Sequence, residues 1–319
     1  MSIFRYQNPI GHGDARGIRD AQILRHADKW YLTGTVPGFY MGEDNPGVRL
    51  FESDDLLNWR DAGLLIDRRT IPDDAWYRDR FWSPELHQWR GRWYLTFTSC
   101  NESQKHYFQL YWGLAVADHI TGPYEVLTKE RPPAFEIGGG DATLFVEDDD
   151  AYALWSCGCL YCSRIDLRNG KLLGEPWKTI CHSEIPTNWD GVGIEAPYVV
   201  KHDGLYHLFY SSWSRGYEVG HATAPFLKGP WTKRGPVYGA FDQKYLAGLT
   251  TPPEHDPSSP FMGAGHNAVF TGPDGQLWLS CHGMLKNNVP KVCIDPIPFD
   301  TGGHIPYFGP SYQPREIRW

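Results

Sequence analysis

One pattern of apolar and polar positions recurs along the chain. Each copy begins with a polar or aromatic residue, continues as an apolar strand, turns at Asp or Gly, and returns as a strand rich in aromatic residues. The five copies cover residues 19–32, 82–95, 140–155, 194–210 and 265–279. Two strands joined by a short turn predict a β-hairpin in each copy, and Asp203-Gly204 and Asp274-Gly275 are the strongest local turn signals.

A second strand pattern follows the first in three of the copies. Residues 48–59, 114–124 and 220–231 each hold a strand, a turn, and an aromatic residue that opens the next strand. The middle of the aromatic strand recurs every 54 to 71 residues, which leaves room for four short strands per repeat. A β-sandwich of this length would not need a repeat in constant phase. We therefore expect an all-β, five-bladed β-propeller, formed as a single domain by residues 1–319.

Composition agrees with this fold and argues against several kinds of partner. Of the 319 residues, 34 are Gly and 25 are Pro, scattered as many tight turns require. The net charge is −8 and no Lys/Arg-rich run stands out, so we expect no nucleic-acid partner and no anionic membrane surface. The sequence holds no run of about 18 apolar residues, so it predicts no membrane-spanning helix. The 14 Trp and 18 Tyr could pack the blades or stack on sugar rings.

The cysteines and the first residues bear on the compartment. Seven cysteines are an odd number, which favours reduced thiols over a disulfide framework. Cys157, Cys159 and Cys162 lie close together, but no second ligand pair has zinc-site spacing, so we interpret them as strand ends around a short turn. The first six residues lack the apolar core of a signal peptide. The sequence predicts a cytoplasmic protein, or a secreted or periplasmic one whose signal peptide has been removed.

The residues that open the repeats are the candidates for a functional site. The innermost strand of a propeller blade lines the central channel, so these residues should converge on one funnel. In chain order they are Asp20, Trp82, Asp141, Glu195 and His266. A single Asp at a strand start is usually a turn former, but three carboxylates at one phase of a repeat indicate a shared site. Trp82 could equally pack the core. His266 could be a buried structural histidine, although among carboxylates we expect it to contact substrate or the water shell of a central cation.

Converging carboxylates beside an aromatic side chain fit glycoside hydrolysis. That reaction needs one carboxylic acid to protonate the leaving oxygen and one carboxylate to activate water or to attack. Arg19 beside Asp20 favours the ionised carboxylate, which suits a base. The apolar residues on both sides of Glu195 would raise its pKa, which suits an acid. Asp141 follows three glycines and would keep the acid protonated by like-charge repulsion.

These motifs resemble glycoside hydrolase family 43, whose members are five-bladed propellers. The resemblance covers essentially the whole chain, in five segments that occur in order: Arg19-Asp20-Ala21-Gln22, Trp82-Ser83-Pro84-Glu85, Gly140-Asp141-Ala142-Thr143, Glu195-Ala196-Pro197 and Gly263-Ala264-Gly265-His266. It implies inversion at the anomeric carbon, with Asp20 as general base, Glu195 as general acid, and Asp141 tuning and orienting the acid. It also implies that Trp82 lines the site. His266 would lie near the channel centre, where some members hold a calcium or sodium ion.

The resemblance implies a hydrolase that removes a terminal pentose, α-L-arabinofuranose or xylose, from an oligosaccharide or polysaccharide. No cofactor is required, although a structural calcium or sodium ion could occupy the central channel and contact His266 through water. Three alternatives stay open: a galactan or galactoside hydrolase, a retaining fructosidase-type propeller or a phosphorylase, and a non-catalytic sugar-binding propeller. The sugar, the linkage and endo or exo action depend on loops such as 35–45 and 242–260. Nothing in the sequence sets the oligomeric state.

Overall fold

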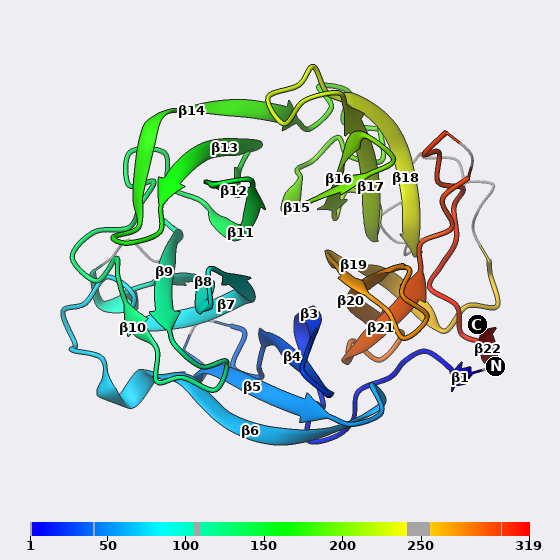
Figure 1. Ribbon diagram of the computed structural model, residues 1–319, viewed down its shortest axis with the longest axis horizontal. Coiled ribbons are helices and arrows are strands. Elements are labelled where there is room, and N and C mark those ends of the chain that lie inside the picture. Colours follow the sequence, from blue (N-terminus) through cyan, green and yellow to red (C-terminus); the bar gives the residue numbers. More distant parts are fainter. Residues whose placement is uncertain (1, 41, 105–108, 241–255, 301) are drawn as a thin grey trace.

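The described part of the computed structural model is almost entirely β-strand. It comprises residues 2–40, 42–104, 109–240, 256–300 and 302–319. Within these ranges there is no α-helix, and the helical segments are two 3-10 turns, η1 (Arg68–Thr70) and η2 (Glu102–Gln104). No helix in them is long and apolar enough to cross a membrane. Five sheets stand in chain order around one axis (Figure 1), which confirms the expected five-bladed β-propeller.

Each blade is an antiparallel meander that runs outward from the axis. The first blade holds β3 (Arg19–His26), β4 (Lys29–Thr35), β5 (Gly47–Ser53) and β6 (Asn58–Asp67), with β2 (His12–Gly13) at its outer edge. The second holds β7 (Asp79–Trp89), β8 (Arg92–Cys100), β9 (Tyr111–Ala117) and β10 (Glu125–Val126). The third holds β11 (Gly140–Glu147), β12 (Asp150–Cys157), β13 (Cys159–Asp166) and β14 (Lys171–Cys181). The fourth holds β15 (Glu195–His202), β16 (Leu205–Ser212), β17 (Tyr217–Ala224) and β18 (Thr232–Ala240). The fifth holds β19 (Phe261–Thr271), β20 (Leu277–Leu285) and β21 (Pro290–Pro296).

All five predicted hairpins are present as the two innermost strands of each blade. Asp203 and Gly204, with φ of 47° and 78°, form the expected two-residue turn between β15 and β16. Both residues take positive φ because this turn type matches the twist of the strands that it joins. The turn in the fifth blade is longer, spanning residues 272–276, and the Gly275 N–H donates to the Gly272 carbonyl at 3.0 Å.

The hydrophobic core lies between the blades. Five clusters of buried side chains each join neighbouring blades, and the one formed by the first and last blades contains Trp30, Trp59 and Trp278. Trp59, Trp112, Trp155 and Trp278 are each at most 2% exposed. This part of the aromatic content therefore packs the blades, as one of the two interpretations of the composition predicts.

The two ends of the chain close the ring. The Ile10 N–H donates to the Val292 carbonyl at 2.8 Å, next to the outermost strand of the three-stranded fifth blade. Asn8 extends this pairing, since its Nδ2 donates to the Ile294 carbonyl at 2.8 Å and its Oδ1 accepts the Ile294 N–H at 3.0 Å. Farther out, β1 (Ile3–Tyr6) pairs with β22 (Arg315–Arg318), so the two termini lie side by side (Figure 1).

The expectation of reduced thiols is wrong for two of the seven cysteines. Cys159 and Cys181 form a disulfide between the first residue of β13 and the last residue of β14. They are direct cross-strand partners, a relation that a count of cysteines does not contain. The other five cysteines are free. Cys157 ends β12 and Cys159 begins β13, with Gly158 as the turn, which confirms the strand-end interpretation of this segment.

Candidate active site

Each innermost strand is irregular near its start. The residue at this point takes a left-handed conformation with φ between 48° and 55°, and the five residues are Asp20, Ser83, Asp141, Ala196 and His266. The pairing register with the second strand shifts at each of these places, as in a β-bulge. A non-glycine residue in this conformation costs on the order of 1–3 kcal/mol, and such residues cluster at functional sites.

Contrary to the prediction from the repeat, the three carboxylates do not all occupy the same position of their bulges. Asp20, Asp141 and His266 occupy the left-handed position, whereas Trp82 and Glu195 come one residue earlier. The five side chains still converge, because a bulge places two residues opposite one residue of the partner strand. They line one pocket of about 330 Å³, whose other walls are Arg19, Thr35, Phe39, Tyr40, Arg80 and Ser83.

Four of the five bulges are held by the second strand of the preceding blade. In each, a backbone N–H donates to a side chain of that strand. The pairs are Ser83 N–H to Thr35 Oγ1 (2.8 Å), Asp141 N–H to Thr98 Oγ1 (2.7 Å), His266 N–H to Ser211 Oγ (2.8 Å) and Asp20 N–H to His282 Nδ1 (3.0 Å). These bonds satisfy backbone donors that the irregular ladder leaves unpaired. They also tie the candidate residues of one blade to its neighbour, so the site depends on the packing of the ring.

Asp20 is surrounded by positive and hydrogen-bonding groups. Its carboxylate accepts a hydrogen bond from the Thr35 hydroxyl, and its Oδ1 lies 3.3 Å from Nδ1 of both His266 and His282. Burial acts to raise the pKa of Asp20, but the His266 imidazolium and Arg19 hold that pKa well below its usual range. The ionised carboxylate expected from Arg19 is thus present, with His266 as the largest stabilising influence.

The two histidines have opposite charge states. Burial acts to lower the pKa of His266, but Asp20, Asp141 and Glu195 raise it to about 10, so this ring is an imidazolium at neutral pH. Burial lowers the pKa of His282 to about 4, and its neutral Nδ1 can accept the Asp20 N–H. Sequence reasoning missed His282 because it lies in a second strand outside every motif. The one feature that could have pointed to it is its place opposite Gly265 in the predicted fifth hairpin.

Asp141 is held by hydroxyl groups and faces other carboxylates. Its Oδ1 accepts from Ser83 Oγ at 2.7 Å and its Oδ2 accepts from Ser156 Oγ at 3.2 Å. Burial raises the pKa of Asp141 to about 6; His266 acts against this rise, and Glu195 adds to it. Asp141 therefore takes up a proton much closer to neutral pH than an exposed aspartate does.

The surroundings of Glu195 differ from the expectation. Its carboxylate accepts a hydrogen bond from the Tyr217 hydroxyl, and its Oε1 lies 3.5 Å from His266 Nδ1. The carboxylate thus has polar partners, although its sequence neighbours are apolar. Successive side chains of a strand point to opposite faces, so sequence neighbours do not surround one another. Tyr217, on β17, carries no sequence motif and was not expected here.

Arginine and aromatic side chains complete the pocket wall. The guanidinium of Arg80 lies 5.5 Å from the ring centroid of Trp82, and that of Arg19 lies 5.6 Å from Phe39. Trp82 is half-buried and lines the pocket, so it is accessible to a ligand. Phe39 and Tyr40 come from one of the loops expected to set specificity, which includes residue 41 outside the described part. Most of the other such loop, residues 241–255, also lies outside it.

The channel offers oxygen atoms one layer below the carboxylates. Two residues after each left-handed position, the innermost strands carry Gln22, Glu85, Thr143, Tyr198 and Ala268. In the described residues, Glu85 Oε2 and Thr143 Oγ1 are buried without a hydrogen-bond partner, although His87 Nε2 lies 3.3 Å from Glu85. Calcium prefers oxygen ligands, so this layer fits such a cation. Asp141, Glu195 and His266 also group within 4.8 Å, but a protonated imidazole is not a metal ligand.

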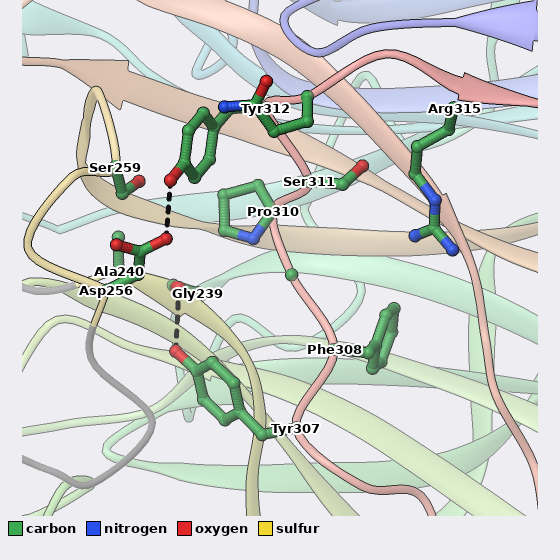
Figure 2. A pocket seen from close by; sticks show the side chains of 12 residues that line it. Gly239, Ala240, Asp256, Ser259, Tyr307, Phe308, Pro310, Ser311, Tyr312 and Arg315 are labelled. Carbon is green, nitrogen blue, oxygen red and sulfur yellow. Dashed lines mark hydrogen bonds between the residues drawn. The ribbon is translucent and has the colours of Figure 1, made fainter.

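A larger cavity, of about 500 Å³, lies elsewhere (Figure 2). It is lined by the end of β18 and by residues 307–313, and the hydroxyls of Tyr307 and Tyr312 donate to the Gly239 carbonyl and to Asp256 Oδ2 at 2.7 and 2.6 Å. Among its described lining residues, Asp256 is the one carboxylate. We therefore assign the chemistry to the smaller pocket, where three carboxylates meet.

Comparison with known proteins identifies the family. The model of glycosyl hydrolases family 43 matches residues 6–305. The chain belongs to glycoside hydrolase family 43. Solved structures of similar fold include a thermostable family-43 glycoside hydrolase, with a TM-score of 0.72, 24% identity, and coverage of 97% of this chain and 98% of that one. An endo-arabinase from Bacteroides thetaiotaomicron VPI-5482 has a TM-score of 0.70 and 22% identity, with coverage of 95% and 100%.

Similar curated proteins include a xylosidase/arabinosidase 43B of Humicola insolens, 28% identical over 82% of this chain and 46% of that protein. A beta-xylosidase of Formosa agariphila is 22% identical over 94% of this chain and 50% of that protein. This family 43 chain thus spans about half the length of these two relatives. An extracellular exo-alpha-(1->5)-L-arabinofuranosidase of Streptomyces chartreusis is 27% identical, covering 85% of this chain and 80% of that protein.

Proposed function

We propose that this family 43 chain is an inverting glycoside hydrolase that releases a terminal pentose, α-L-arabinofuranose or xylose, from an oligosaccharide or polysaccharide. The observation that carries the proposal is the pair formed by Asp20 and Glu195. The two carboxyl groups enter one pocket from the first and fourth blades, and the His266 imidazolium and Arg19 keep Asp20 ionised. The names of the relatives, xylosidase and arabinofuranosidase, support a pentose.

In this proposal the two groups carry out different parts of the reaction. Asp20, oriented by Thr35 and His282, removes a proton from the water that attacks the anomeric carbon. Glu195 donates its proton to the leaving oxygen on the other face of the sugar, so the configuration at the anomeric carbon inverts. Between them the His266 imidazolium, within 3.5 Å of a carboxylate oxygen of each, holds both groups in place and limits their mutual repulsion.

Asp141 and the aromatic wall have supporting roles in this proposal. The Asp141 carboxylate lines the pocket beside Glu195, and it stabilises the positive charge that develops on the sugar ring. Trp82 offers an apolar face to the terminal sugar. The chemistry needs no cofactor. A calcium or sodium ion held by Glu85 and Thr143 would add positive charge beneath the site.

The test is turnover of a panel of pentofuranosides, pentopyranosides and galactosides, with proton NMR of the first-formed anomer. We expect hydrolysis of a pentoside with inversion. A retained anomer would contradict the mechanism in favour of the retaining alternative. Sugar binding without turnover would favour the non-catalytic propeller, and turnover of galactosides alone would favour the galactan alternative.

The acid role has its own variant. Glu195→Ala should lower kcat/KM by roughly 10²- to 10⁴-fold on substrates with poor leaving groups, because general acid catalysis is lost. Substrates with good leaving groups should lose far less. Glu125→Ala is the matched control, since this glutamate is exposed on β10. Unchanged activity of Glu195→Ala on poor leaving groups would remove Glu195 from the role of acid.

A further inference from the structure

A second cavity adjoins the catalytic pocket. It measures about 490 Å³ and shares Arg19, Tyr40 and Glu195 with the smaller pocket, whereas Asp20 and Asp141 line the smaller pocket alone. An inverting hydrolase holds the leaving group on the side of its acid and the attacking water on the side of its base. With Glu195 on the shared wall, the smaller pocket takes the sugar that is released and the second cavity takes the leaving group.

The second cavity has an aromatic wall. Trp213, in the connection between β16 and β17, is 43% exposed and lines it. The indole packs against Gly193, where an added Cβ would lie 2.6 Å from Trp213 Cζ2. This contact constrains the position of the ring while much of its surface stays free. A large aromatic side chain that is held in place and exposed beside a cavity is suited to bind a ligand.

The rest of the lining indicates a neutral ligand of variable shape. Met262 and Met284 contribute flexible apolar side chains, and Asn288 comes from the loop before β21. Apart from the shared Arg19 and Glu195, the described residues of the lining include no charged side chain, because burial keeps His282 neutral. Such a wall does not match a phosphate or a carboxylate, which would require paired cations. It matches the apolar face and the hydroxyl groups of a second sugar.

We propose that Trp213 is the main binding residue for a second, uncharged sugar on the leaving-group side of Glu195. The inference rests on the proposed function and assigns to one residue the binding of the sugar from which the terminal pentose is released. A compound with a small leaving group cannot use this site. Trp213 is therefore a specificity-determining residue that the proposed mechanism does not itself require.

The experiment compares two substrates with the same terminal pentose. One is a pentose disaccharide, and the other is the glycosyl fluoride, whose leaving group is a single atom that cannot reach Trp213. Trp213→Ala should lower kcat/KM on the disaccharide by roughly 10-fold or more, through loss of aromatic contact, and Trp213→Phe should lose less. Both variants should hydrolyse the fluoride within twofold of the unaltered protein. Phe226→Ala is the matched control, because Phe226 is 67% exposed and lines neither cavity.

The outcomes separate this inference from the proposed function. If the unaltered protein hydrolyses neither substrate, the proposed function fails, and this inference with it. If it hydrolyses both, and Trp213→Ala leaves the disaccharide rate unchanged, the second-sugar site is wrong while the hydrolase stands. An equal loss on both substrates would also overturn the inference, since it would mean that Trp213 supports the shape of the catalytic pocket.

Discussion

Asp20 and Asp141 carry the same side chain in opposite electrostatic settings. The His266 imidazolium and Arg19 lie beside the carboxylate of Asp20, so its pKa stays well below the usual range despite burial. Asp141 accepts hydrogen bonds from two serines and lies near Glu195, and burial raises its pKa to about 6. Near pH 6 the change in charge of this pocket therefore comes from Asp141 rather than from Asp20.

This difference predicts the acid side of the pH profile. Below about pH 6 Asp141 takes up a proton and the pocket loses one of the negative charges that stabilise the transition state, so kcat/KM should fall as pH drops through 6. An unshifted aspartate would place this fall about two pH units lower. Profiles measured on the glycosyl fluoride, whose leaving group needs no acid, separate the effect of Asp141 from that of Glu195. Asp141→Asn should lower the plateau and remove the fall near pH 6; a wild-type profile that stays flat down to pH 4 would contradict the assignment.

The sequence pattern predicted the site residues near the start of each innermost strand. It could not predict the residues that form hydrogen bonds to them. Asp20, Trp82, Asp141, Glu195 and His266 follow from the repeat, and all five line one pocket. His282 and Tyr217 lie on second and third strands, and they reach the site only through the register of their blades. Strand register is a long-range property, so no local pattern reports it.

At the scale of elements, the hairpins were predictable and the bulges were not. Alternation and turn residues predict where two strands pair, and all five hairpins formed as expected. The bulges insert one residue without changing composition, which is why Glu195 is one position out of phase with Asp20 and Asp141. The same neglect of register explains the missed disulfide between Cys159 and Cys181.

Two neighbouring strands of the fourth blade carry a buried histidine pair. His207 on β16 and His221 on β17 stack with ring centroids 5.1 Å apart, and His207 Nδ1 lies 2.9 Å from His221 Nε2. Both rings are fully buried. Burial lowers the pKa of each, that of His221 to about 3. In the unfolded chain both would titrate near their ordinary value of about 6.5.

The pair should make stability depend on pH. Between about pH 6.5 and 3 the unfolded chain binds more protons than the folded one, so the free energy of unfolding falls as pH drops through this window. The expected loss between pH 7 and 4 is about 3 kcal/mol from His221 alone. Denaturation of His221→Gln across this range should show a shallower slope than the unaltered protein, whatever its stability at pH 7. His119→Gln, at an exposed histidine that does not act on the pair, should keep the original slope, and equal slopes for all three proteins would refute the prediction.

At the scale of the whole molecule, the ring depends on contacts between its ends. Asn8 takes the place of a strand residue beside Ile294, with a donor and an acceptor that match one backbone unit. Asn8→Ala should leave this buried N–H and C=O unpaired and lower the free energy of unfolding by about 1–3 kcal/mol. Denaturant titration measures the loss. Asn287→Ala, on an exposed loop, should change it little, and an equally small effect of Asn8→Ala would show that the pairing does not stabilise the closed ring.

Ring closure also determines when the protein can become active during its synthesis. Asp20 leaves the ribosome early, whereas its partner His282 follows 262 residues later. Until then the first blade has one neighbour instead of two, and Asp20 lacks both the His266 imidazolium that keeps it ionised and the His282 ring that accepts its N–H. Such a high contact order makes formation of the site a late event in folding. A chain released before the fifth blade would hold Asp20, Asp141 and Glu195 and yet lack the charge balance for turnover. We therefore expect activity only from chains in which the fifth blade has been translated.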